Sequence, residues 1–238
     1  MTENSPDPRL SGEFLRRPTS DVTLVGVVHD HPASIYRVQH VVTDRDPDVL
    51  ALELPPTALP LFETYAQDDR TPPVFGGEMS AAIQSATTDR TVGIDGPSVG
   101  FVRKLLRTLR RDRASLSTVR SVVRGVLTST KKAALCRVAD AVATRTSLRV
   151  EVDAPVVYDS TRSDEPARQA ANEERQVGRA ESILDALVPT NAADYRDSTR
   201  ETHMADRIET LRDEGSVVAV VGYAHLDPVA ERLDDHEE

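Results

Sequence analysis

The N-terminal part of the chain alternates between short apolar runs rich in β-branched residues and segments in which apolar residues recur at helical spacing. The short runs predict buried strands, and the periodic segments predict amphipathic helices. The predicted strands cover residues 20–28, 49–54 and 90–95. The predicted helices cover residues 34–42, 57–67 and 78–83.

The rest of the chain is predicted to be mostly helical. Residues 98–143 keep a helical pattern, and residues 148–158 fit either a short strand or an extended connection. The remaining expected elements are helices at 165–187, 192–212 and 226–233 and a strand at 216–221. Gly215 suits the end of the helix that precedes this strand.

This order of elements predicts an α/β fold with a mainly parallel central sheet flanked by helices. We expect a flexible tail at residues 1–18 and one domain at residues 19–238. A helical insertion is expected at about 98–190, with its basic part at 98–146. No segment approaches the ~20 apolar residues of a membrane span, and the first residues carry no apolar leader, so we expect no transmembrane segment and a cytoplasmic location.

The charge composition is acidic and unusually poor in lysine. Asp and Glu number 39 against 29 Lys and Arg, which gives a net charge of −10. This balance resembles halophilic adaptation to a salt-rich cytoplasm, where a Debye length of about 3 Å at molar salt screens the acidic surface; an ordinary acidic protein is the alternative. Cys136 is the single cysteine, which excludes an intramolecular disulfide, and we expect it to be a small core residue.

Two copies of Gly-x-x-His close strand-like runs near opposite ends of the chain. The first runs from Gly26 to His29 and the second from Gly222 to His225. Ligands of open parallel sheets bind at the carboxyl ends of the strands, and glycine allows a close backbone approach there. Two further predicted strands deliver a carboxylate to the same kind of position, and these residues are Glu53 and Asp95.

These residue types suit a metal site. Two neutral imidazoles and a carboxylate, here His29, His225 and Glu53, are typical ligands of Zn²⁺, Mn²⁺, Fe²⁺ or Co²⁺. A metal with an open position acidifies bound water and produces a hydroxide nucleophile near neutral pH. Two other candidates have equally simple structural roles. Glu78 would favour a helix N-terminus, and Arg200 would either clamp an anionic group or pair with a neighbouring acid in solvent.

Five blocks of sequence, in order along the chain, resemble the TraB/PrgY/GumN family. The family includes the TIKI metalloproteases and is related to the erythromycin-esterase-like and ChaN-like proteins. The matching blocks are residues 24–29, 46–54, 77–83, 200–208 and 218–226. The resemblance therefore covers most of the chain.

The resemblance implies roles for individual residues. His29 and His225 correspond to the histidines of the two family motifs, Glu53 to the paired acid, Arg200 to the family arginine and Glu78 to the acid that opens a helix. TIKI members are metal-dependent peptidases that favour Mn²⁺ or Co²⁺, so the resemblance implies a divalent metal. PrgY-type members block a peptide pheromone, which implies a peptide or small-molecule partner.

Residues 101–137 form a basic stretch with eleven cationic side chains and one acidic side chain, Asp112. It could be a cap neutralised by the acidic body, or it could contact an anionic surface or another copy of the chain in a homo-oligomer. Phe101 is its one aromatic residue, so stacking on nucleic-acid bases is not favoured.

These observations lead to one main hypothesis and one alternative. The first is a metal-dependent hydrolase, acting on a peptide or amide, with Glu53, Glu78 and Arg200 as catalytic residues. His29, Glu53 and His225 would hold the metal, and Gly26, Gly222 and Asp95 would support the site. The alternative is a non-catalytic protein that binds a peptide or small ligand in the same place, as a pheromone-shutdown regulator would.

Overall fold

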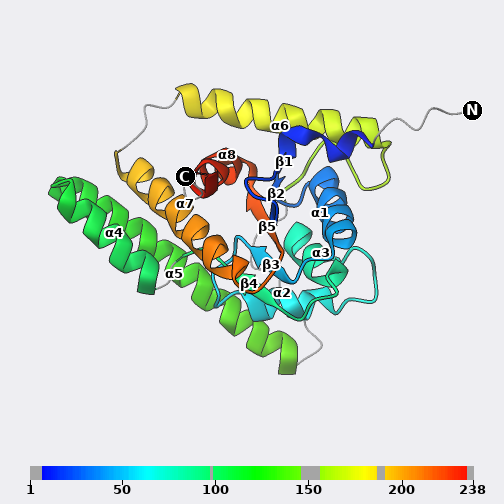
Figure 1. Ribbon diagram of the computed structural model, residues 1–238, viewed down its shortest axis with the longest axis horizontal. Coiled ribbons are helices and arrows are strands. Elements are labelled where there is room, and N and C mark those ends of the chain that lie inside the picture. The colour runs from blue at the N-terminus through cyan, green and yellow to red at the C-terminus, as the bar shows by residue number, and fades with distance from the viewer. Residues whose placement is uncertain (1–6, 97–98, 146–155, 187–190, 235–238) are drawn as a thin grey trace, which may run out of the picture.

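The computed structural model describes residues 7–96, 99–145, 156–186 and 191–234 and has an α/β fold (Figure 1). Its sheet has the order β1-β2-β5-β3-β4, and β2, β5, β3 and β4 run parallel while β1 is antiparallel to β2. The strands are β1 (Leu15–Arg16), β2 (Val22–Val27), β3 (Val49–Leu52), β4 (Thr91–Gly93) and β5 (Val217–Gly222). The predicted fold class, a mainly parallel sheet flanked by helices, is confirmed.

Helices cover both faces of this sheet. In chain order they are α1 (Pro32–Arg45), α2 (Leu59–Ala66), α3 (Gly77–Ser85), α4 (Val99–Arg111), α5 (Leu116–Arg145), α6 (Pro166–Ala186), α7 (Asn191–Arg212) and α8 (Tyr223–Asp234). Most expected helices are present with ends shifted by a few residues. None of the helices in the described part of the chain combines the length and apolarity needed to cross a membrane.

The central strand β5 shows how the sheet builds two cores. Successive side chains of a strand point to opposite faces. Val217, Ala219 and Val221 belong to the core shared with α7 and α8. Val218 and Val220 belong to the core shared with α1 and α3. Every residue of the apolar run is therefore buried, as expected for a parallel strand covered on both sides.

Residues 7–18, which we expected to be part of a flexible tail, are attached to the body of the protein. Two 3₁₀ turns, Pro8–Leu10 and Gly12–Phe14, precede β1. Phe14 is buried, and the Arg37 guanidinium lies 3.9 Å from the centre of its ring. Leu15 also packs against the core, and the polar composition of the rest of the segment does not indicate these two contacts.

The helical pattern expected at 98–143 is present as two helices, α4 and α5, joined by a turn. Arg113 has a positive φ of 51°, and the Ser115 hydroxyl accepts a hydrogen bond from the backbone N–H of Thr118 at 3.1 Å. This serine cap starts a second helix after the turn. The expected strand or connection at 148–158 lies largely outside the described residues, and residues 156–158 are not in a strand.

The helices between β4 and α7 lie on two sides of the molecule. Figure 1 shows α4 and α5 next to α7 and α2, whereas α6 lies beside α1 on the other side. A fully buried ion pair between Arg37 of α1 and Glu173 of α6 joins these two helices. Cys136 of α5 is buried against α2, as expected for a small core residue.

Candidate active site at the carboxyl edge of the sheet

Four parallel strands end at one edge of the sheet, and each is followed by a polar side chain. His29 follows β2, Glu53 follows β3, Asp95 follows β4, and His225 lies in the first turn of α8 after β5. The pairing of β2 with β5 and of β5 with β3 places the two histidine-bearing strands next to each other and Glu53 beside them. The sequence-predicted candidates therefore share one edge.

Arg200 of α7 connects three of these residues. Its Nη2 atom lies 2.6 Å from Oε1 of Glu53 and 2.8 Å from Oδ2 of Asp95, and its Nε donates to Oδ1 of Asp95 at 3.0 Å. Its Nη1 lies 3.1 Å from Nε2 of His225. Burial alone would lower the pKa of Arg200, but the bond to Asp95 and the charge of Glu53 outweigh it and raise that pKa above its usual range.

This geometry defines what Arg200 can do. Three of its nitrogens already donate to Asp95, Glu53 and His225, so the guanidinium is not open to a bidentate contact with a substrate carboxylate. The side chain is 24% exposed. In this arrangement Arg200 positions the carboxylates, and the anion-clamping role considered from the sequence would require it to release them.

The Glu53 carboxylate is held from two directions. Oε1 accepts from Arg200, and Oε2 accepts from the backbone N–H of Gly222 at 2.6 Å. Its Oε1 also lies 3.7 Å from Nε2 of His225. With only 5% of its side chain exposed, Glu53 has one fixed orientation toward the end of β5.

The two motif glycines have different environments. A Cβ on Gly26 would lie 2.7 Å from Cδ2 of the core residue Leu226, so a side chain there would force Leu226 of α8 to move. A Cβ on Gly222 would lie 3.4 Å from Oε2 of Glu53, which is an ordinary contact distance. Gly26 is therefore needed for space, whereas the contribution of Gly222 to the site is its N–H.

The His225 imidazole bridges Arg200 and an acid that the sequence analysis did not select. Its Nδ1 lies 3.2 Å from Oε1 of Glu201, which in turn pairs with Arg232 at 3.0 Å. Because Nη1 of Arg200 can only donate, neutral His225 carries its proton on Nδ1 and accepts at Nε2. Burial lowers the pKa of His225, but Glu201 and Glu53 outweigh burial and the pKa is raised overall.

His29 forms the second part of the site with Glu78. Its Nδ1 lies 2.6 Å from Oε1 of Glu78, whose Oε2 accepts from the backbone N–H of Asp30 at 2.8 Å. Glu78 stands in the first turn of α3 and is buried. The hydrogen bond and charge of Glu78, with a smaller contribution from Glu53, raise the pKa of His29 to about 9.

The His29 imidazole is accessible. Its side chain is 64% exposed, against 3% for Glu78. Since Nδ1 is held by Glu78, Nε2 is the nitrogen that faces outward, and it has no hydrogen-bond partner among the described residues. At neutral pH this imidazole is a cation that presents one N–H to a ligand.

Tyr158, in the segment before α6, lies at the same edge of the sheet and contacts His29. Its hydroxyl donates to the backbone oxygen of His29, and its ring lies edge-on to His31, with 4.7 Å between the ring centroids. Burial and the charges of Asp30 and Glu78 raise the pKa of Tyr158 to about 12, so the hydroxyl keeps its proton. Tyr158 and Glu201 are the site residues that sequence reasoning missed. Tyr158 belongs to no motif, and Glu201, although it lies in the block 200–208, does not follow a strand.

The predicted metal ligands share one feature with known metal sites. Both histidines hold a carboxylate at Nδ1, which is the usual way in which proteins orient metal-binding imidazoles. However, the described residues contain no group of three His, Cys, Asp or Glu side chains placed to hold an ion. The Arg200 guanidinium supplies the positive charge between Glu53 and His225 instead. The three predicted ligands are therefore not gathered around one point in the described residues, and metal binding stays a prediction.

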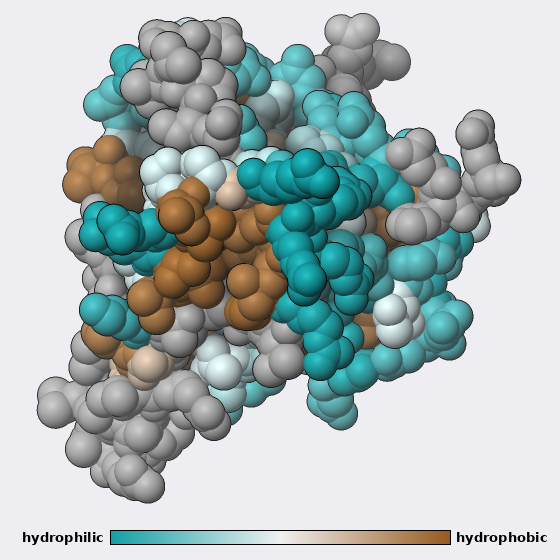
Figure 2. All heavy atoms as spheres, turned by 90° about the vertical axis from the view of Figure 1, so that its left-hand side faces the viewer, coloured by the Kyte–Doolittle hydropathy of each residue, from teal (hydrophilic) through white to brown (hydrophobic). Residues whose placement is uncertain are grey.

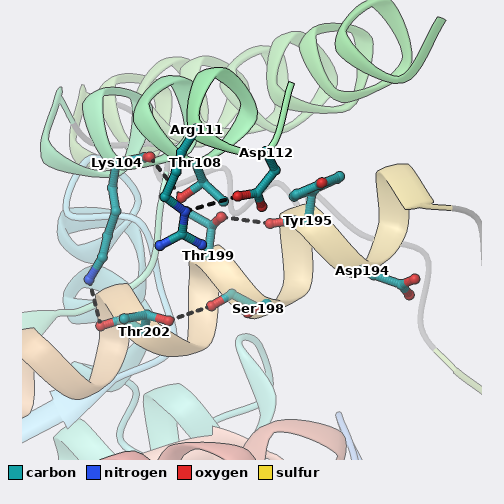
Figure 3. Close-up of a pocket in the computed structure, with 9 residues that line it drawn as sticks. All are labelled: Lys104, Thr108, Arg111, Asp112, Asp194, Tyr195, Ser198, Thr199 and Thr202. Carbon is teal, nitrogen blue, oxygen red and sulfur yellow. Dashed lines mark hydrogen bonds and ion pairs between the residues drawn. The ribbon is translucent and has the colours of Figure 1, made fainter. Parts of the chain in front are cut away.

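A separate hollow of about 590 Å³ lies between α4 and α7 (Figure 3). Hydroxyl groups dominate its lining, and its two cations are already paired: Lys104 with Asp206 at 2.5 Å and Arg111 with Asp112 at 2.9 Å. None of the predicted site residues lines it. The exposed imidazole at the sheet edge is therefore the stronger candidate for chemistry.

Comparisons with known proteins add no relative. No protein-family model, curated protein or solved structure matches the chain. The features of the chain that indicate a function are therefore the geometry of this edge and the sequence blocks that predicted it.

Proposed function

We propose that this protein is a hydrolase that cleaves an amide bond, with a peptide as the simplest substrate, at the carboxyl edge of its sheet. The observation that carries the proposal is the pair formed by exposed His29 and buried Glu78. A charged imidazole with a fixed orientation and a free N–H is suited to donate a proton. The neighbouring Glu53 supplies an oriented acceptor.

In the proposed reaction Glu53 accepts a proton and His29 donates one. Water adds to the carbonyl carbon of the substrate while Glu53 takes the proton that water loses. The C–N bond then breaks as His29 gives its Nε2 proton to the departing nitrogen. Return of the proton from Glu53 to His29, directly or through water, restores both groups, and the products are a carboxylic acid and an amine.

Arg200, Asp95 and His225 act through Glu53 in this proposal. Arg200 and the N–H of Gly222 fix the two oxygens of the carboxylate, and Asp95 and His225 fix the guanidinium. Such preorganisation lowers the reorganisation needed during proton transfer. These three side chains are positioning residues, and their loss would reduce the rate without removing the proton donor.

The experiment that tests the proposal compares hydrolysis of a set of fluorogenic peptides and simple amides by the wild-type protein and three variants. His29→Gln and Glu53→Gln are expected to lower kcat/KM by about a hundredfold or more, as loss of a general acid or base does. His40→Gln is the matched control, because His40 is an exposed histidine of α1 outside the site. It should retain the wild-type rate.

The alternative function has a distinct outcome in the same experiment. A ligand-binding regulatory protein would bind a peptide without releasing products, and His29→Gln would change its affinity only. The observation in favour of this alternative is that Glu53 and His225 are already hydrogen-bonded to other parts of the protein. Hydrolysis by wild type that is unchanged in His29→Gln would contradict the hydrolase proposal.

The proposal also includes the setting of the protein. The acidic, lysine-poor composition suits a protein that works in a salt-rich cytoplasm. Salt there screens the repulsion between the acidic side chains that give the chain its net charge of −10.

A further inference from the structure

The outer face of the α4–α5 hairpin exposes several large apolar side chains. They are Val102, Leu106, Leu116, Val123, Leu127 and Leu135, with exposures from 36% to 89%. Figure 2 shows an apolar patch bordered by a hydrophilic band on the face that looks out to the left of Figure 1, the side on which the α4–α5 turn lies. Exposed apolar residues gathered in this way mark an interaction surface.

The fold does not use this outer face. The inner face of α4 carries Phe101, Leu105 and Leu109, which are buried with Val122 of α5. On α5, Leu116, Val123 and Leu127 are separated by seven and four residues, so they form one stripe along the helix. The hairpin therefore has a second apolar surface that packs against nothing in the described part of the chain.

Cationic side chains accompany this stripe. They are Arg103, Arg107, Arg110, Arg113, Arg120, Arg124 and Lys131, and all are exposed. Among the described residues none of the seven pairs with a carboxylate, in contrast to Lys104 and Arg111 of the same hairpin. Arg120 and Arg124 lie within the span of the apolar stripe on α5. Their charges are available to an anionic partner.

We propose that this face binds the surface of a membrane that contains anionic lipids, with α5 lying in the plane of the interface. Apolar side chains enter the acyl boundary, while arginines remain among the headgroups. The apolar stripe from Leu116 to Leu127 offers about 17 Å of contact at 1.5 Å per residue. The proposal is independent of the proposed hydrolase activity.

Two other occupants fit less well. A second copy of the hairpin in a two-fold dimer would place these unpaired cations opposite one another. An acidic protein surface would match the charges but would have to bring an apolar stripe of its own. Anionic lipid supplies negative charge and an apolar interior together along the stripe from Leu116 to Leu127.

The test uses the absence of tryptophan from the chain. Leu116→Trp introduces one fluorescent reporter at a side chain that is 89% exposed, and Val157→Trp introduces the matched reporter at one that is 92% exposed before α6. We expect the emission of Leu116→Trp to shift to the blue with vesicles containing phosphatidylglycerol but not with pure phosphatidylcholine. The emission of Val157→Trp should not shift with either vesicle.

Sedimentation with the same vesicles measures binding without a reporter. Arg120→Glu/Arg124→Glu should lower the partition coefficient at least tenfold, whereas Arg175→Glu/Arg179→Glu, the same charge change on exposed positions of α6, should leave it near wild type. Absence of wild-type sedimentation with anionic vesicles would overturn the proposal. So would equal losses in the two double variants, or retention on an acidic polypeptide column without vesicle binding.

Discussion

The Nη2 atom of Arg200 lies 2.6 Å from Oε1 of Glu53, and this contact joins α7 to the end of β3. The same guanidinium reaches Asp95 after β4 at 2.8 Å. One cation from a helix thus balances two carboxylates at neighbouring strand ends. Both carboxylates are largely buried, so their orientation depends on Arg200.

Arg200→Met is expected to destabilise the fold by about 2 kcal/mol, because it leaves two largely buried carboxylates without their cation. Urea unfolding followed by circular dichroism measures the change. Arg90→Met is the matched control, since Arg90 forms a bidentate pair with Glu214 in which both side chains are well exposed. Exposed pairs contribute little. Equal losses in the two variants would refute a special role for the Arg200 network.

The Arg37–Glu173 pair should show strong coupling. Neither side chain is accessible to solvent, so Arg37→Met or Glu173→Leu alone should cost about 3–5 kcal/mol by leaving one buried charge unpaired. The double variant should cost clearly less than the sum of the two, as a double-mutant cycle of unfolding free energies would show. Strict additivity would mean that the two charges do not interact across α1 and α6.

The two motif glycines should respond differently to alanine. Gly26→Ala is expected to lose about 1–2 kcal/mol, because the new methyl group would meet Leu226 at 2.7 Å. Gly222→Ala should change stability little, since its nearest contact would be 3.4 Å from Glu53. Thermal unfolding of both variants tests this difference, and a larger loss for Gly222→Ala would contradict the packing described here.

Much of the fold could be predicted from the pattern of apolar residues. Runs such as 217–221 are apolar at every position because both faces of the sheet are covered, and this is a local property of the sequence. The attachment of residues 7–18 was not predicted, since it depends on Phe14 meeting Arg37, a contact between distant parts of the chain. The sequence pattern does not place the turn between α4 and α5, because the Ser115 cap lies within a stretch that is helical in pattern throughout.

The candidate site could be predicted only in part, because strand ends can be located from the sequence but side-chain contacts between distant elements cannot. Strand ends locate His29, Glu53, Asp95 and His225 at one edge without further information. Which of them touch depends on side chains from helices. Arg200 of α7 forms hydrogen bonds with Glu53, Asp95 and His225, whereas His29 pairs with Glu78 of α3. Glu201 lies next to Arg200 in the block 200–208 but does not follow a strand, so its contact with His225 becomes visible only in three dimensions.

The His29–Glu78 pair makes stability depend on pH in a defined direction. The pKa of His29 is about 9 in the folded protein against 6.5 for a free imidazole. The stabilisation is therefore complete below pH 6.5 and is lost as the pH rises to about 9. Between these values the unfolding free energy of wild type should fall relative to that of Glu78→Gln. A constant difference between the two proteins would contradict this linkage.

The most direct test of the central claim, that a protonated and exposed His29 is the working group of this edge, is an NMR titration of its imidazole. The account predicts a pKa of about 9 in wild type and a value near 6.5 in Glu78→Gln. His40→Gln removes another exposed histidine signal and helps to assign the resonance. A wild-type pKa near 6.5, unchanged by Glu78→Gln, would contradict the account.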